Sequence, residues 1–312
     1  MDRTALVLGA TGGVGGETAR ALLAVGWKVR ALARTPDIAR GDIEWMKGDA
    51  LDAETVAKAA KGVQAIVHAV NPPGYRDWDK VVLPMLDNSI AAARDAGARL
   101  ALPGTIYNFD PASEPVLRPD TPQHPRTRKG AIRMEMERRL EQPGLRSMIL
   151  RAGDYFGPRP GNNWFSQGLV TPGKPVRSIL YPGRKGLGHA WAYLPDLGQA
   201  FARVLDREAD LPDFARFHFA GHWIYENDIA SAIAHITGRD WIGVRRMPWG
   251  LLPLVAPFNP TMREMIEMRP FWDHPTRLDN SELVAAIGEE PYTPFEIAVA
   301  AVLDALGCLR SA

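Results

Sequence analysis

A glycine-rich turn near the start of the chain constrains the fold more than any other feature. The apolar run Ala5-Leu-Val-Leu8 leads directly into Gly9-Ala-Thr-Gly12-Gly-Val-Gly15, and an apolar helical stripe follows over 13–25. A buried strand, a tight turn and a helix that begins in the turn form the first half of a βαβ unit. Glycines there allow the turn, close approach of a ligand and close packing of helix on strand. Because free N–H groups at a helix start bind pyrophosphate, the sequence predicts a dinucleotide site.

Short apolar runs alternate with helical patterns through the first half of the chain. We expect strands at 5–9, 28–33, 43–46, 65–70, 99–102 and 147–152, with helices over 13–25, 54–61, 78–96 and 128–140. This alternation is typical of an α/β protein with a Rossmann-type, doubly wound parallel sheet. Beyond residue 153 the pattern becomes irregular, with helices expected over 197–206 and 226–237 and a strand at 216–220. The sequence predicts an NAD(P)-binding domain over 1–153, to which later segments can return, and a smaller C-terminal substrate lobe over 154–312.

Composition and charge argue against several classes of function. Lys plus Arg total 37 and Asp plus Glu total 36, and the formal net charge of +1 does not support binding to nucleic acid or an anionic membrane. Cys308 is the single cysteine, and no histidine or cysteine cluster has metal-ligand spacing. No apolar run approaches a membrane span, and the N-terminal run is too short for a signal peptide. We expect a cytoplasmic protein without a metal, whose partner is a small-molecule substrate.

The residues after the second expected strand indicate which ribose the site accepts. A carboxylate at this position hydrogen-bonds a free 2′-hydroxyl, whereas an arginine accommodates a 2′-phosphate. The strand 28–33 is followed by Arg34 and Thr35, with no carboxylate before Asp37. Arg34 lies about 20 residues beyond Gly15, which is the usual offset for this position. The pattern favours NADP over NAD.

Further motifs connect the chain to a known family. They are Gly9-Ala-Thr-Gly-Gly-Val-Gly15, Gly48-Asp-Ala-Leu-Asp52, Val67-His-Ala-Val-Asn71, Thr105-Ile-Tyr-Asn108, Arg151-Ala-Gly-Asp-Tyr-Phe-Gly-Pro158 and His189-Ala-Trp-Ala-Tyr-Leu-Pro-Asp196. With these motifs, most of the chain resembles the extended and atypical short-chain dehydrogenases/reductases, the superfamily of NAD(P)-dependent epimerases and dehydratases.

The resemblance implies a set of cofactor contacts. They are the glycine loop with Gly9, Thr11, Gly12, Gly13, Val14 and Gly15; Asp49 and Ala50 at the adenine; Ala69, Val70 and Asn71 along the nicotinamide side; and the segment 153–156, with Tyr155, at the border of nicotinamide and substrate. Tyr155 is alternatively an aromatic residue of the core or of the cleft lining.

The catalytic pair of the family is not intact in this chain. Family members carry Tyr-x-x-x-Lys on the helix after the fifth strand, where this spacing puts both side chains on one face. Alignment on Lys129 puts Pro125 in the place of the tyrosine, and alignment on Glu135 leaves no lysine. Thr105 and Tyr107 remain at the carboxyl end of the fifth strand, where parallel sheets place their chemistry. Tyr107 is either a proton donor or a buried structural tyrosine, and Lys129 either holds the cofactor ribose or is solvated.

Three hypotheses about function follow from these features. The first is an NAD(P)-dependent oxidoreductase that transfers hydride to or from a small organic substrate. The second is a sugar-nucleotide epimerase or dehydratase, and the third is a non-catalytic NADP-binding sensor or scaffold. The resemblance also implies a homodimer formed through the helices 78–96 and 128–140.

Overall fold

The computed structural model of the protein describes residues 3–72, 78–159, 163–258 and 260–309. The central sheet consists of β1 (Thr4–Leu8), β2 (Lys28–Ala33), β3 (Glu44–Lys47), β4 (Ala65–His68), β5 (Arg99–Gly104), β7 (Ser147–Arg151) and β11 (Phe214–His218). Shorter strands are β6 (Val116–Leu117), β8 (Asp154–Phe156), β9 (Ser178–Tyr181), β10 (His189–Tyr193), β12 (His222–Ile224), β13 (Gly243–Arg246) and β14 (Arg277–Leu278). The helices are α1 (Gly13–Ala24), α2 (Ala53–Ala59), α3 (Trp78–Ala96), α4 (Arg128–Leu140), α5 (Leu194–Asp206), α6 (Glu226–Thr237), α7 (Leu252–Val255), α8 (Pro260–Glu267), α9 (Arg269–Asp273), α10 (Ser281–Ile287) and α11 (Phe295–Ala305).

The seven strands of the central sheet are parallel and stand in the order β11-β7-β5-β4-β1-β2-β3. The direction of chain progression reverses between β1 and β4. In an open α/β sheet, ligands bind outside the carboxyl ends of the strands at this reversal point. The predicted α/β class and the Rossmann-type sheet are confirmed, and the glycine loop lies at the reversal.

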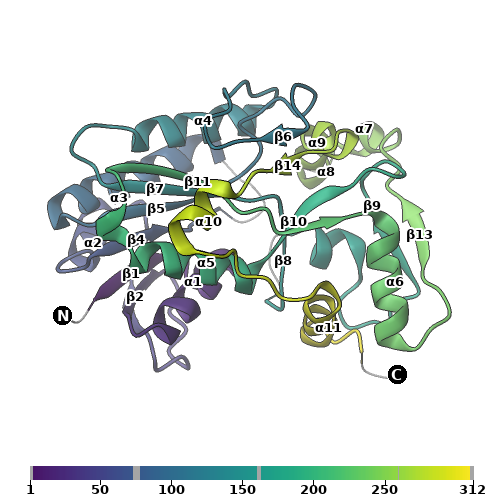
Figure 1. Ribbon diagram of the computed structural model, residues 1–312, viewed down its shortest axis with the longest axis horizontal. Helices are drawn as coiled ribbons and strands as arrows, with labels where there is room; N and C mark the ends of the chain where they lie inside the picture. Colours follow the sequence, from purple (N-terminus) through teal and green to yellow (C-terminus); the bar gives the residue numbers. More distant parts are fainter. Residues whose placement is uncertain (1–2, 73–77, 160–162, 259, 310–312) are drawn as a thin grey trace.

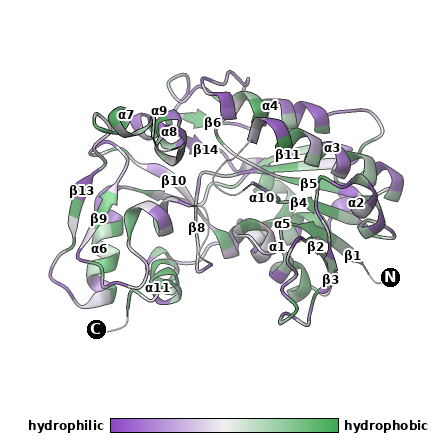
Figure 2. Cartoon of the chain, turned by 180° about the vertical axis from the view of Figure 1, so that it is seen from behind, coloured by the Kyte–Doolittle hydropathy of each residue, from purple (hydrophilic) through white to green (hydrophobic). Residues whose placement is uncertain are grey.

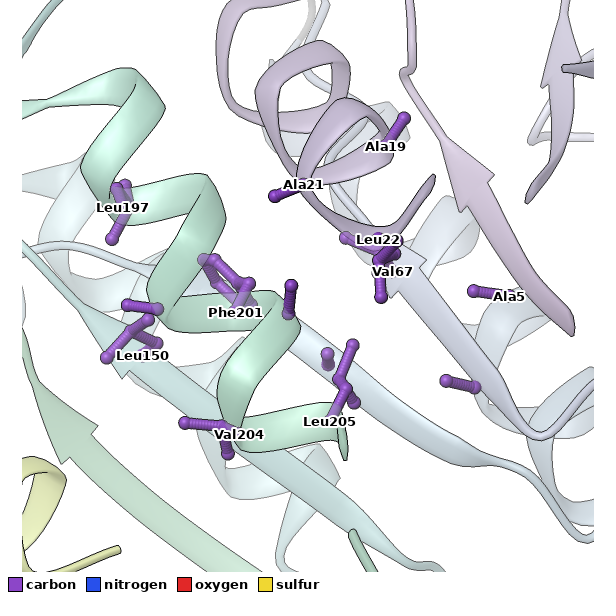
Figure 3. Packing of buried hydrophobic residues seen from close by; sticks show 14 of the residues in the cluster. Ala5, Ala19, Ala21, Leu22, Val67, Leu150, Leu197, Phe201, Val204 and Leu205 are labelled. Atoms are coloured by element: carbon purple, nitrogen blue, oxygen red, sulfur yellow. The ribbon is translucent and has the colours of Figure 1, made fainter. Parts of the chain in front are cut away.

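Helices cover both faces of the sheet, because parallel strands are apolar on both sides. On one face α1 and α5 pack over β1, β4 and β7, and Figure 3 shows Leu22, Leu197, Phe201 and Leu205 gathered there. The other face is covered by apolar residues of α2, α3 and α4. In Figure 2 the strands around β1 and β4 are hydrophobic, whereas α4 is largely hydrophilic.

The remaining elements form a second part of the molecule beside the carboxyl ends of the sheet. Its core strands are β12, β10 and β8, and a second pair is β13 with β9. Figure 1 places α6, α11, β9 and β13 at the end of the molecule opposite β1 and β2. The aromatic residues Phe156, Trp191 and Trp272 lie in the apolar core of this part, with α6 and α11 packed around it.

Segments beyond residue 153 do return to the first part of the chain. Strand β11 pairs with β7 at the edge of the central sheet, and α5 packs on α1. Gly198 allows this approach, because a Cβ there would lie 2.7 Å from the backbone of Glu17. A division into domains at residue 153 stays a prediction, as does a homodimer through α3 and α4. None of the helices in the described part of the chain is long and apolar enough to cross a lipid bilayer.

Candidate functional site

The glycine loop is held in a form that side chains would prevent. Gly9 has φ +90°, and a Cβ there would lie 2.5 Å from the carbonyl oxygen of Ala69. A Cβ on Gly15 would overlap the carbonyl oxygen of Gly9. The loop closes by a hydrogen bond of 2.9 Å from the amide of Gly12 to the Gly9 carbonyl. These glycines therefore bring β1, β4 and α1 into contact at the reversal point of the sheet.

The N-terminus of α1 fits an anionic group. Gly12 is its N-cap, no side chain caps the helix, and no acidic residue occurs in its first turn. The first N–H groups of such a helix and its dipole favour a negative charge. Gly12 and Thr11 are exposed, and Gly13 and Val14 are partly exposed. The pyrophosphate of a nicotinamide dinucleotide fits this cradle, and the dinucleotide would supply hydride transfer at its nicotinamide ring.

Three arginines surround the first turns of α1. Glu17 is buried and forms ion pairs with Arg20 at 2.6 Å and Arg159 at 2.9 Å. Arg40 comes from the loop after β2, and its Nη1 is buried without a hydrogen-bond partner in the described part of the chain. Burial lowers the pKa of Arg40, and the charges of Arg159 and Arg20 lower it further. The group of Arg20, Arg40 and Arg159 thus lies near the carboxylates of Glu17, Asp37 and Asp42.

The predicted adenine and nicotinamide contacts follow β3 and β4. The Asp49 carboxylate accepts a hydrogen bond from the Leu51 amide, which fixes the turn before α2. Ala50 is buried, and its carbonyl accepts a hydrogen bond from Asn88. Asn71 accepts a hydrogen bond of 2.7 Å from the Trp78 indole.

Other predicted contacts lie at the ends of β2 and β4. Arg34 is exposed directly after β2, whereas Ala69 and Val70 are partly buried after β4. The roles predicted for all these positions in binding the dinucleotide remain predictions.

Thr105, Tyr107 and Tyr155 lie close together at the carboxyl ends of β5 and β7. The Thr105 hydroxyl accepts a hydrogen bond from the Tyr107 amide at 3.3 Å, and the Tyr107 ring packs on Phe271 with centroids 5.2 Å apart. The Tyr155 hydroxyl donates to the Gly104 carbonyl at 3.0 Å, which ties β8 to the end of β5. The catalytic roles of Thr105 and Tyr107 stay predictions.

Lys129 is buried against α8 rather than solvated. Its side chain is 1% exposed, and its ammonium lies 2.7 Å from the Glu264 carboxylate and 3.6 Å from that of Glu267. It also donates to the Glu264 carbonyl at 2.9 Å. The alternative of a solvated lysine is therefore wrong, while the predicted ribose contact stays a prediction.

We expect Lys129→Met to lower stability, since it removes the cation that lies between two carboxylates. The expected loss in free energy of unfolding is about 2 kcal/mol, less than for a fully buried pair because Glu264 and Glu267 remain partly exposed. Urea denaturation measures it, with Lys185→Met as a control at an exposed lysine. Loss of dinucleotide affinity at unchanged stability would instead support the ribose contact.

Sequence reasoning missed a cluster of polar side chains in the second part of the molecule. Asp154, Tyr181, His189 and Trp191 come from β8, β9 and β10. The Tyr181 hydroxyl and Trp191 Nε1 are buried and face each other, whereas His189 Nε2 is buried without a hydrogen-bond partner in the described ranges. Burial raises the pKa of the Asp154 carboxyl from 3.8 to about 7, and lowers that of His189 to about 4. Asp154, His189 and Trp191 belong to the motifs 151–158 and 189–196, but the spacing along the chain does not predict that they meet.

The comparisons with known proteins agree with this geometry. Residues 9–164, half of the chain, match the family described as NAD(P)H-binding, so the chain belongs to this family. The match covers the glycine loop, the strands from β2 to β7 and the segment around Asp154, and it begins directly after β1.

Two curated relatives match parts of the chain. The 3-diazoavenalumate denitrifying reductase of a Streptomyces species is 29% identical over 174 residues, which are 50% of this chain and 57% of the relative. The sterol demethylase protein B of Methylococcus capsulatus is 41% identical over 81 residues, 25% of each chain. The matched regions thus span a little over half of the first relative and a quarter of the second.

Solved structures share the whole fold at low sequence identity. UDP-glucose 4-epimerase from Brucella ovis, solved with NAD, is 15% identical, covers 98% of both chains and has a TM-score of 0.74. UDP-N-acetylglucosamine 4-epimerase from Bacillus cereus is 16% identical, covers 96% of this chain and 95% of its own, and has a TM-score of 0.71. These structures confirm the predicted Rossmann-type fold, and the family match confirms the prediction of an NAD(P)-binding chain.

Proposed function

We propose that the protein binds NADP and exchanges hydride between this cofactor and a small organic substrate held against β8 and β10. The observation that carries the proposal is the cradle at α1, where an uncapped helix start meets a group of arginines. A helix start alone suits the pyrophosphate of NAD and NADP equally. The arginines are the feature that favours NADP.

The 2′-phosphate of NADP adds about two negative charges beside the second strand. Arg34 and Arg40 both belong to the loop after β2, and Arg40 is partly buried next to Arg20 and Arg159. Arginine binds phosphate through charge-assisted hydrogen bonds with a planar fork of donors. A bound phosphate would therefore supply the acceptor that the buried Arg40 Nη1 lacks in the described part of the chain.

We expect Arg34→Ala to weaken NADP roughly 30-fold and NAD little, because it removes a charge-assisted contact to the phosphate. Arg40→Ala should act in the same direction. Isothermal titration with both dinucleotides measures the effect at fixed ionic strength. Arg245→Ala is the matched control, since this exposed arginine lies on β13 in the second part of the molecule. An equal loss for both cofactors would remove the assignment to NADP.

Measuring the consumption of NADPH distinguishes an oxidoreductase from a protein that binds the dinucleotide but catalyses no reaction. The reductase among the curated relatives supports hydride transfer for this chain as well. We expect NADPH to be consumed with at least one member of a panel of small aldehydes and ketones. Stoichiometric NADP binding without turnover of either this panel or a sugar-nucleotide panel would support a sensor or scaffold instead.

A further inference from the structure

Asp154 occupies an unusual environment for a carboxylate. It keeps some accessible surface, yet the surrounding protein raises its pKa to about 7. Among the described residues, neither a hydrogen-bond donor nor a cation is found at bonding distance from it. An enclosed carboxyl without partners lowers stability, and such groups gather at sites where a proton must be moved.

The sheet register places Asp154 on the same face as other buried polar groups. Asp154 is the register partner of Trp191 in the parallel pair β8–β10, so both side chains emerge on the same face. The Phe156 ring, two residues along on this face, packs on Trp191 with centroids 6.2 Å apart. Trp272 then links Trp191 to Tyr181 and His189, with centroid distances of 5.8, 6.0 and 4.8 Å.

The titratable rings of this cluster are uncharged near neutral pH, and the carboxylates of Glu226 and Asp228 at the start of α6 act on it from outside. Burial keeps His189 neutral by lowering its pKa to about 4. Burial also raises the pKa of Tyr181, with Glu226 and Asp154 adding to the effect, and it raises that of Tyr193 to about 12. Glu226, at the start of α6, is paired with Arg246 at 3.2 Å. The cluster therefore offers neutral hydrogen-bonding groups and one carboxyl that titrates near pH 7.

Asp154 also stands beside the edge where the dinucleotide chemistry is expected. It follows the end of β7 by three residues, and Arg151 at that end is in register with Gly104 of β5. The Tyr155 hydroxyl bonds to the Gly104 carbonyl and fixes β8 at this edge. A π-helical turn, Phe165–Leu169, packs on the same face as Asp154 through Phe165 and Phe156, whose centroids are 5.9 Å apart. Such turns are rare and occur frequently at functional sites.

We propose that Asp154 is the catalytic proton donor and acceptor for a small apolar or aromatic carbonyl compound, and that the buried Tyr181, His189 and Trp191 form the neutral layer behind its carboxyl group. This inference rests on the proposed hydride transfer. In reduction, the carbonyl carbon gains a hydride, that is two electrons and one hydrogen, from the dinucleotide, the C=O π bond opens, and Asp154 gives its proton to the carbonyl oxygen. The Asp154 carboxylate then regains a proton from water. Asp154 thus replaces the tyrosine that the helix α4 lacks.

The chemistry of the cluster also selects the substrate. The side chains around Asp154 are aromatic rings, a neutral imidazole and a phenol, and no lysine or arginine belongs to the cluster as described. A nucleoside diphosphate would bring two or more negative charges next to an ionisable carboxyl without a compensating cation, which is unfavourable in a partly buried site. An uncharged carbonyl compound with an apolar body avoids this cost.

The first test compares Asp154→Asn with the wild-type protein in the consumption of NADPH with benzaldehyde, acetophenone and cyclohexanone. We expect kcat to fall roughly 100-fold or more, as for removal of a general acid. NADPH affinity, measured by fluorescence titration, should be unchanged.

Wild-type kcat/KM for reduction should fall as the pH rises above about 7, because the protonated carboxyl is the donor. The variant should lack this step. Asp210→Asn, at an exposed residue in the short turn Glu208–Asp210 after α5, is the control with unchanged kcat.

The second test needs no substrate. The folded-state pKa of Asp154 lies above the ordinary value, so ionisation is disfavoured in the folded protein and wild-type stability falls as the pH rises from 3.8 through about 7. Asp154→Asn should therefore have a higher Tm than the wild-type protein at pH 8, and the difference should vanish near pH 4. A structural aspartate would show the reverse, a lower Tm for the variant.

The outcomes separate the two proposals. Wild-type turnover that survives in Asp154→Asn overturns the role of Asp154 and leaves the proposed hydride transfer intact. NADPH binding without wild-type turnover of any carbonyl compound overturns the hydride transfer. A lower Tm of Asp154→Asn at pH 8 overturns the inference about Asp154 whatever the turnover shows.

Discussion

The variant Gly12→Val should fold normally and bind NADP about 100-fold more weakly, a loss of about 2.7 kcal/mol in binding free energy. Gly12 has φ −88° and ψ 179°, extended backbone that any residue adopts. A Cβ on Gly12 would lie 3.3 Å from the Gly9 carbonyl oxygen and otherwise meet open space. The added methyl groups would occupy the space in front of the α1 N–H groups, where the pyrophosphate must approach. Isothermal titration gives the affinity, and thermal unfolding in the absence of cofactor gives the stability.

Two other glycines provide the controls for this prediction. Gly15→Ala should destabilise the protein itself, because its Cβ would overlap the backbone of Gly9. Gly250→Ala should change neither stability nor affinity, since nothing lies within 4 Å of its Cβ position. Wild-type affinity in a folded Gly12→Val protein would mean that the dinucleotide does not approach this turn.

Arg151→Met should remove about 3–5 kcal/mol from the free energy of unfolding, because it leaves the buried Glu137 carboxylate without its cation. The Arg151 guanidinium donates to both Glu137 oxygens at 2.9 and 2.6 Å, and the two side chains are 0% and 4% exposed. Arg151 also donates to the Pro119 carbonyl and lies over the Phe109 ring. The pair fastens α4 to β7 beneath the carboxyl edge of the sheet. Urea denaturation at pH 7 measures the loss.

A double-mutant cycle isolates the pair from the other contacts of Arg151. Adding Glu137→Leu to Arg151→Met should recover part of the lost stability, since no charge is then buried alone. The exposed pair Arg138–Glu135 is the comparison, and Arg138→Met should have little effect there. Equal losses for Arg151→Met and Arg138→Met would show that burial of the Arg151–Glu137 pair does not govern its contribution.

The sheet could be predicted from the sequence because its information is local. The strands β1, β4 and β5 are short apolar runs with a helix after each, and the predicted helices 78–96 and 128–140 agree with α3 and α4. A strand is predicted over 65–70, but β4 ends at His68. The next residue, Ala69, has its carbonyl group packed against Gly9. The strand predicted at 216–220 is two residues too late in the chain, because β11 spans Phe214–His218. Its place at the sheet edge beside β7 depends on tertiary contacts that periodicity does not encode.

Some residues of the candidate site could be predicted from the sequence, and others could not. The glycine loop and Arg34 could be named from spacing, because one βαβ unit positions them. The group of Arg20, Arg40 and Arg159 could not, since it combines α1 with two loops that lie far apart in the sequence. Asp154 was inside a quoted motif, but its significance depends on which partners it lacks. Which partners Asp154 lacks can be seen only in the folded structure, where β8, β9 and β10 come together.

The position of α5 and β11 has a consequence for synthesis of the chain. While residues up to 153 leave the ribosome, one face of the sheet lacks the cover of Leu197, Phe201 and Leu205, and β7 is an open edge. Uncovered apolar faces and unpaired edges are sites of aggregation during folding. Roughly 65 further residues, up to the end of β11, must therefore be synthesised before the apolar face and the open edge of the sheet are covered. Fragments cut at residue 153 would expose this surface permanently, and chaperones that hold apolar segments would act on the intact chain during the same interval.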